Sequence, residues 1–290
     1  MDETKREQKF DLVCVLGMGK LAIECIKLLM ASGGVKICLY DVNIKKSLYL
    51  ESFADNNQIL YFHLSKEEIF KQLEIISVPT LLCSIVNPYI FPDKILSNKN
   101  ITAINMHHAL LPKHPGRNSE AWAIYEQDKC AGITWHFISS IVDGGPIIAQ
   151  EGIELTEEIT AYRLFELQDK LAIQAFKGFY KKLLNGNVEG KANESGKYSV
   201  HLSKDRPNEG FLNLDWNGEK ISAFLRSMDY GPLNTLGKPM IYYENVLYVI
   251  KKYKISKKTV ENSILQIGDT LLINKDSYSF RLICVPANDT

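Results

Sequence analysis

The stretch that decides the fold is FDLVCVLGMG, residues 10–19, in which a short apolar run is closed by a glycine turn. After that turn, apolar residues recur with mainly helical spacing up to Gly33-Gly34, and a second apolar run, VKICLY, follows at residues 35–40. Because a helix between two strands leaves no room for a hairpin, the economical interpretation is a parallel strand-helix-strand unit. Sheets of this kind bind ligands at the carboxyl ends of their strands.

The alternation of strands and helices continues along the chain. Apolar runs at residues 80–86, 101–106, 132–137 and 146–150 predict further strands, the last of them after a DGG turn. Amphipathic stretches at 66–73 and 160–184 predict helices. We therefore expect an α/β fold built on a Rossmann-like parallel sheet.

A second, smaller domain is expected at the C-terminal end. The sequence turns polar and glycine-rich between residues 187 and 207, which is typical of an interdomain linker. Beyond it, residues 218–228 predict a helix, and alternating segments at 240–243, 246–253 and 270–273 predict strands joined by turns. This pattern favours a helix-plus-β-barrel domain of OB-like type. The expected division is residues 1–195 for the larger domain and 196–290 for the accessory domain.

Bulk composition limits the classes of function. Lys plus Arg and Asp plus Glu each number 34, so no net field draws the chain to nucleic acid or to an anionic membrane. The N-terminus lacks an apolar signal region, and no stretch reaches the roughly 20 apolar residues of a membrane span, so a cytoplasmic protein is expected. The six cysteines show no CxxC or metal-ligand spacing, and we expect neither a metal nor disulfides.

The chemically informative residues lie in INMHHALLPKHPGRN, residues 104–118, and in VDGGPII, residues 142–148. Alternation along the predicted strand at 101–106 places Asn105 and His107 on one side, where both can address a ligand beyond the strand end. A nearby loop carboxylate, Asp143, would complete a three-residue site.

These residues resemble those of the folate-dependent formyltransferases, a group that includes the methionyl-tRNA, glycinamide ribonucleotide and amino-sugar N-formyltransferases. The shared pattern is N-x-H, then LLP-xxxG, then D-xG-xI, and the similarity extends to GITWH at residues 132–136 and to LDW at residues 214–216. Three segments are most similar in sequence to formyltransferases of natural-product biosynthesis: GITWH, GRN at 116–118 and MDYGPLNTLGKP at 228–239. The resemblance implies transfer of the formyl group of N10-formyltetrahydrofolate to an amine, without a metal.

The expected roles follow from that reaction. His107 would take the proton that the attacking amine loses, since its pKa suits proton transfer near neutrality. Asn105 would donate through its amide to the oxyanion, and Asp143 would orient His107 or relay the proton.

The resemblance also implies the residues that bind the two substrates. A pterin needs apolar walls with a few main-chain hydrogen bonds. The expected folate contacts are Ser84, Ile85, Val86, Asn87, Tyr89, Ile90, Leu111, Ile141 and Val142. The turn at residues 116–118 fits a plain loop, and it also fits a contact of Arg117 or Asn118 with the acceptor or its phosphate. Ala109 replaces a serine that is frequent before LLP in the relatives, so a hydroxyl contact is absent here.

Other functions stay open at this point. Gly17-x-Gly19-x-x-Ala22 after a strand, with Asp41 ending the next strand, also fits the dinucleotide site of an NAD-dependent oxidoreductase. A non-catalytic module that binds folate or a carrier protein is a third class. For a formyltransferase, the acceptor could be a small amine, an aminoacyl group on a carrier protein, a nucleotide-linked amino sugar or methionyl-tRNA. The neutral charge counts against tRNA, whose affinity comes largely from Lys and Arg contacts to phosphate.

Overall fold

A computed structural model describes residues 9–194, 196–258 and 261–289 of the chain. The chain divides into two compact units. Unit 1 comprises the chain up to Pro115 together with Gly132–Gly152 and Gln168–Val200, and unit 2 comprises Gly116–Ala131, Ile153–Leu167 and the chain from His201 onward.

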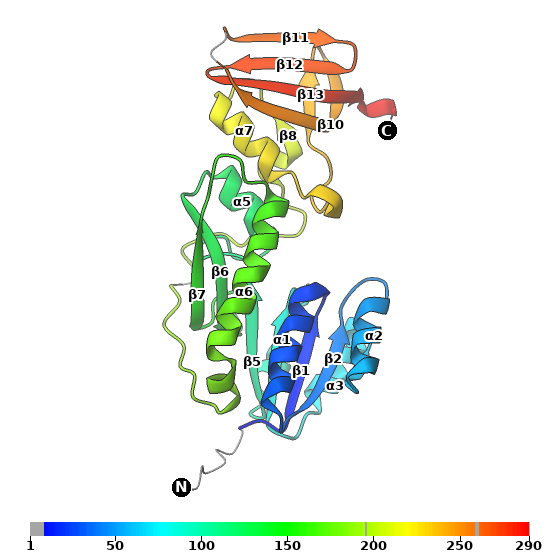
Figure 1. Cartoon of the computed structure of the whole chain (residues 1–290), viewed down its shortest axis with the longest axis vertical. Coiled ribbons are helices and arrows are strands. Elements are labelled where there is room, and N and C mark those ends of the chain that lie inside the picture. The colour runs from blue at the N-terminus through cyan, green and yellow to red at the C-terminus, as the bar shows by residue number, and fades with distance from the viewer. Residues whose placement is uncertain (1–8, 195, 259–260, 290) are drawn as a thin grey trace. The chain divides into compact units, whose positions relative to one another are not determined.

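The core of unit 1 is a seven-stranded sheet with the order β3-β2-β1-β4-β5-β6-β7 (Figure 1). Its strands are β1 (Leu12–Gly17), β2 (Lys36–Asp41), β3 (Leu60–Phe62), β4 (Thr80–Ile85), β5 (Ile101–His107), β6 (Cys130–Phe137) and β7 (Ile147–Glu154). Strands β1 to β5 pair in parallel, as the sequence predicts for β1, β2, β4 and β5, and β3 adds a strand that the sequence did not predict.

The expected parallel pairing does not extend to β6, which pairs with β5 in antiparallel fashion. A parallel neighbour requires a crossover helix that packs back on the sheet. The helix that precedes β6, α5 (Ser119–Tyr125), instead buries Ala121, Ala123 and Ile124 in the core of unit 2. Without that crossover, β6 returns beside β5 in the opposite direction.

Helices cover both faces of the sheet of unit 1. On one face, α1 (Gly19–Ser32), α2 (Leu48–Asn56) and the C-terminal part of α6 (Ala161–Leu184) share one apolar core with β1 and β4, in which Ile26 and Phe176 are fully buried. On the other face, α3 (Lys66–Glu74) and α4 (Asp93–Leu96) form a second core through Ile69 and Ile95. Because the middle strands are covered on both sides, polar side chains can gather only at their ends.

The glycine turn after β1 is used for packing. A Cβ on Gly17 would lie 2.7 Å from the carbonyl oxygen of Ile85 and 2.9 Å from the Cβ of Ala22. Asp41 is fully buried, and its carboxylate accepts from Tyr61, from the backbone and side chain of Asn43, and from the backbone of Ser47. Both oxygens of Asp41 therefore hold the loop after β2, which is a different role from binding a ribose.

Unit 2 is built on a six-stranded sheet with the order β11-β12-β13-β10-β9-β8. Its strands are β8 (Phe211–Leu212), β9 (Met240–Tyr243), β10 (Val246–Lys257), β11 (Ser263–Ile267), β12 (Thr270–Lys275) and β13 (Tyr278–Pro286). The helix α7 (Gly218–Ser227) packs Phe224 into one core with Phe280 of β13. Short 3-10 turns occupy η1 (Pro207–Gly210), η2 (Gly231–Leu233) and η3 (Ala287–Asp289). Closure of this sheet into a barrel stays a prediction.

The division of the chain differs from a single boundary at 195/196. The last passage between the units falls at 200/201, and two earlier segments, 116–131 and 153–167, join unit 2. The reason is burial, because Ile124, Ile159 and Leu164 of these segments belong to the apolar core around α7.

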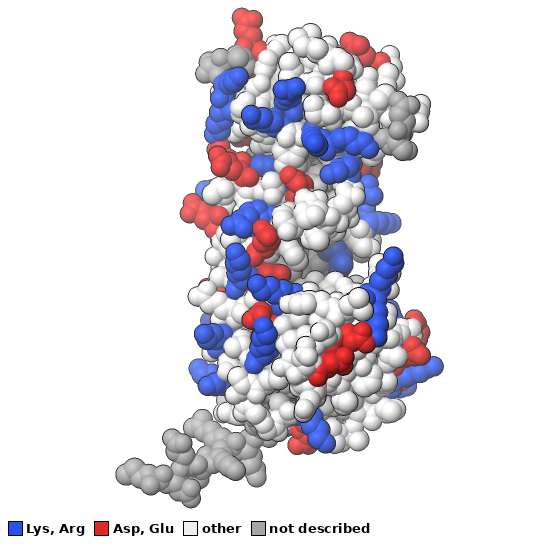
Figure 2. Space-filling view, turned by 45° about the vertical axis from the view of Figure 1, so that its right-hand side comes forward, with Lys and Arg blue, Asp and Glu red and all other residues white. Residues whose placement is uncertain are grey.

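Two surface properties bear on function. No helix among the described residues is long and apolar enough to span a membrane. On the face drawn in Figure 2, Lys and Arg side chains are interspersed with Asp and Glu, in keeping with the equal counts of 34 each.

Candidate active site

The antiparallel pairing of β5 and β6 sets Asn105 directly opposite His136. Asn105 Nδ2 lies 3.1 Å from Nε2 of His136, whose Nδ1 lies 2.8 Å from the carbonyl oxygen of Phe137. Since a carbonyl only accepts, Nδ1 carries the proton and Nε2 accepts from the Asn105 amide. His136 was not among the residues predicted for the site, and its contact with Asn105 depends on a strand direction that no local pattern reveals.

The Asp143 carboxylate lies close to three side chains, those of Asn105, His136 and His107. Its Oδ1 lies 3.5 Å from Nδ2 of Asn105 and 3.5 Å from Nε2 of His136, while its Oδ2 lies 3.5 Å from Nδ1 of His107. These distances are at the long limit for hydrogen bonds and leave the groups free to tighten around a ligand. The structure thus brings Asn105, His107 and Asp143 together within unit 1.

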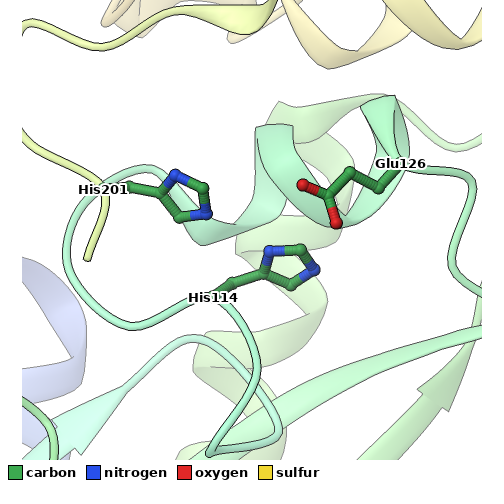
Figure 3. A group of neighbouring side chains, drawn as sticks. All are labelled: His114, Glu126 and His201. Carbon is green, nitrogen blue, oxygen red and sulfur yellow. The ribbon is translucent and has the colours of Figure 1, made fainter. Parts of the chain in front are cut away.

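His107 is held through its other nitrogen. Its Nε2 lies 2.9 Å from the carbonyl oxygen of His114, on the loop that follows Pro112, and the side chain of His114 is drawn in Figure 3. That carbonyl requires a proton on Nε2, so the lone pair of neutral His107 is on Nδ1, the atom beside Asp143. Burial lowers the pKa of His107, and the nearby Asp143 charge partly offsets this effect. The His107 imidazole is therefore uncharged near pH 7 and can accept a proton at Nδ1.

Ser84 determines the orientation of the Asn105 amide. The Ser84 hydroxyl donates to Oδ1 of Asn105 at 2.7 Å, and Nδ2 of Asn87 donates to the Ser84 hydroxyl at 3.2 Å. With Oδ1 engaged on this side, Nδ2 faces His136 and Asp143. The serine was expected among the folate contacts, and its hydroxyl is used inside the site.

The remaining predicted folate contacts differ in accessibility. Ile85 and Leu111 are buried, and the main chain of Leu111 is fixed by Thr134 and Gln150. Val86 directly follows β4 with a φ of 53°, an uncommon conformation for a β-branched residue.

The other predicted folate contacts are exposed or half-buried. Asn87 accepts from the backbone N–H of Tyr89 in a local turn, and the Tyr89 ring packs edge-on against Phe70. Ile90 and Ile141 are 67% and 57% exposed, and Val142 is half-buried. Exposed apolar side chains beside a polar centre are what a flat, apolar ligand requires.

The two residues expected to meet the acceptor belong to unit 2. Arg117 is exposed and its backbone N–H donates to the carbonyl of His201, while Asn118 directly precedes α5 as its N-cap, in a left-handed conformation with a φ of 57°. In the same unit, Glu126 follows α5 and the His201 ring, also drawn in Figure 3, stacks on Trp122 with 4.2 Å between ring centroids.

Comparison with known proteins finds a family match for part of the chain. Residues 56–180, which contain β5, β6 and the Asp143 loop, match the sequence model of the formyl transferase family. Residues 56–180 of this chain therefore resemble a formyl transferase domain.

Relatives that match this chain in sequence are named as formyltransferases. The GDP-perosamine N-formyltransferase of Brucella melitensis is 28% identical over 155 residues, which cover 53% of this chain and 58% of that protein. A methionyl-tRNA formyltransferase of Mycoplasma mycoides is 27% identical over 276 residues, which cover 91% of this chain and 84% of that protein. The chain spans about half the length of the first curated relatives that it matches.

A solved structure shares its fold with nearly the whole of this chain. An N-formyltransferase from Helicobacter canadensis, in complex with folinic acid and dTDP-3-aminofucose, superimposes with a TM-score of 0.74 at 18% identity. The superposition covers 94% of this chain and 99% of that one. At this identity the likeness establishes a shared fold.

Proposed function

We propose that this protein is an N-formyltransferase that moves the formyl group of N10-formyltetrahydrofolate to an amine. The observation that carries the proposal is the contact of Asn105 and His107 with Asp143, in a domain of the formyl transferase family. An amide donor, a neutral imidazole and a carboxylate are the groups that acyl transfer to an amine requires.

In the proposed reaction, the amine attacks the formyl carbon and the carbonyl oxygen becomes an oxyanion. The Asn105 amide, turned by Ser84 so that Nδ2 and not Oδ1 faces His136 and Asp143, donates to that oxyanion. His107 accepts the amine proton at Nδ1, and Asp143, 3.5 Å away, stabilises the imidazolium. The tetrahedral species then collapses, the bond from carbon to N10 breaks, and the proton passes from His107 to N10 of tetrahydrofolate.

The formyl donor is assigned from the family and from the neighbourhood of the site. A folate ring would lie against the half-buried Val86 and Tyr89 and the exposed Ile90 at the carboxyl end of β4, with Ile141 and Val142 as the opposite wall. Asn105 follows on the adjacent strand, in register with Ser84. The formyl carbon of a donor bound there would be within reach of both Asn105 and His107.

For the acceptor, the names of the relatives favour a nucleotide-linked amino sugar. One is named for GDP-perosamine, and the solved structure with the TM-score of 0.74 holds dTDP-3-aminofucose. A methionyl-tRNA acceptor is the second candidate because such an enzyme aligns with 91% of the chain. The equal numbers of acidic and basic residues favour the sugar.

The test is to incubate the purified chain with 10-formyltetrahydrofolate and one acceptor at a time, and to detect the formylated product by mass. The panel contains GDP- and dTDP-linked amino sugars, methionyl-tRNA and a simple amine. We expect product from a nucleotide sugar, and loss of that product in the His107→Ala variant while folate binding is retained. The control is His63→Ala, because Nε2 of His63 contacts the carbonyl of Asn43 in the loop after β2.

Two outcomes would contradict the proposal. Absence of product from every acceptor, together with no rise in melting temperature on adding the folate, would exclude formyl transfer, since a true ligand stabilises the folded state. Full activity in His107→Ala would exclude the assigned base.

A further inference from the structure

The segment after α6, predicted from sequence as a linker, returns to the sheet of unit 1. Lys191 and Ile147 of β7 exchange both backbone hydrogen bonds, each 2.8 Å long. Gly190 packs so closely that a Cβ there would lie 2.4 Å from the Cβ of Pro146. The segment therefore runs beside the chain that connects the Asp143 loop to β7.

Two residues beyond this bridge, the side chain of Asn193 reaches the loop. Its Nδ2 donates to the carbonyl oxygen of Asp143 at 2.8 Å and to that of Gly145 at 3.1 Å. Both N–H groups of one amide are thus used on the two carbonyls that flank Gly144. A primary amide suits this contact because it presents two donors from one nitrogen.

The loop that Asn193 holds has a demanding geometry. Asp143 has a φ of 49°, in the left-handed region that residues with a side chain rarely adopt. A Cβ on Gly145 would lie 1.8 Å from the carbonyl oxygen of Phe137, so the loop is pressed against the end of β6. Local hydrogen bonding within the loop includes one from the N–H of Gly144 to the carbonyl of Ile141. Such a backbone conformation persists only where surrounding contacts determine it.

We propose that Asn193 is a positioning residue that fixes the Asp143 carboxylate between His107 and Asn105 by holding the main chain on both sides of Gly144. This inference rests on the proposed formyl transfer. The carboxylate meets its partners at 3.5 Å, so a small shift of the loop removes it from both, and a misplacement of about 1 Å can cost a hundredfold in rate.

Burial of the Asn193 side chain in this position carries an energetic cost. Oδ1 of Asn193 is buried and has no hydrogen-bond partner among the described residues. A buried acceptor without a partner is unfavourable, and an apolar residue of similar size would avoid the cost. The two donated hydrogen bonds are the feature that only the amide provides.

The decisive variant is Asn193→Asp, which keeps the shape and replaces both donors by a carboxylate oxygen facing two carbonyls. Asn193→Ala removes the amide without adding charge. The matched control is Asn187→Asp, because Asn187 is exposed and lies on the same segment. We expect kcat to fall about tenfold to a hundredfold in both Asn193 variants, with a KM for the folate changed less than about twofold, and Asn187→Asp to equal the wild type.

Two further readouts separate positioning from a general loss of structure. The acid limb of kcat should move to lower pH in Asn193→Ala, because an Asp143 carboxylate that has moved away no longer raises the pKa of His107. Backbone amides of residues 141–146 should exchange hydrogen faster, while those of β1 and β4 keep their protection. A kcat within twofold of the wild type, or unchanged exchange in residues 141–146, would overturn the proposal. If the wild type formylates no acceptor, the proposed function fails, and hydrogen exchange still decides whether Asn193 holds the loop.

Discussion

The Ser84 hydroxyl donates to Oδ1 of Asn105 at 2.7 Å, across the adjacent parallel strands β4 and β5. An amide side chain can present either its oxygen or its nitrogen to a ligand, and this bond selects the nitrogen. The proposed oxyanion donor is therefore oriented by a residue that need not touch the reacting atoms.

Removing that hydroxyl should reduce turnover. In Ser84→Ala the Asn105 amide can turn over, and an oxygen facing the oxyanion repels it, so we expect kcat to fall by about tenfold or more. Ser84→Thr keeps the hydroxyl and should recover most of the activity. The exposed Ser97→Ala serves as the control. Steady-state kinetics with equal rates for Ser84→Ala and the wild type would exclude this role.

The pH dependence of the reaction should follow His107. The neutral imidazole is the active form, so activity is lost as pH falls through the pKa of His107, and burial sets that pKa below the value of an ordinary histidine. Asp143→Asn removes the charge that raises this pKa, so its acid limb should lie at still lower pH, with a reduced maximum rate. Profiles of kcat/KM against pH check the shift, and an acid limb that moves upward in Asp143→Asn would contradict it.

His136 should support both stability and turnover. His136→Ala removes the nearer acceptor of the Asn105 amide, 3.1 Å away in the native site, leaves it Asp143 at 3.5 Å, and opens space beside a buried strand. The expected cost is about 1–3 kcal/mol of unfolding free energy from the lost hydrogen bond, accompanied by a lower kcat. Urea denaturation and kinetics measure the two effects, and an unchanged kcat would show that His136 has only a structural role.

Gly145 should tolerate no side chain, because its Cβ position is 1.8 Å from the Phe137 carbonyl oxygen. We expect Gly145→Ala to displace the Asp143 loop and to lower both kcat and the melting temperature. The matched control is Gly178→Ala in α6, where a Cβ meets nothing within 4 Å and should stabilise the helix by about 0.5–1 kcal/mol. Equal melting temperatures and activities for the two variants would refute the packing argument.

Local patterns were sufficient for most of the secondary structure. Apolar runs predicted β1, β2, β4 and β5, and helical spacing predicted α3, α6 and α7 to within about two residues. The short helix α2 and the short strand β3 were not predicted, since segments of this length carry few periodic positions.

The sequence by itself determined the α/β class and the pairing of Asn105 with His107 on one side of β5, because strand alternation is a local property. It also supplied the motif that led to Asp143. The tertiary structure alone decided how these groups are held: the acceptor at His136, the carbonyl of His114 behind His107, and the two bonds from Asn193. The reason is that these hydrogen bonds join distant residues: the contact with His136 spans 31 positions and the contact from Asn193 spans 50. The direction of β6 and the return of the segment after α6 follow from which apolar surfaces are buried together.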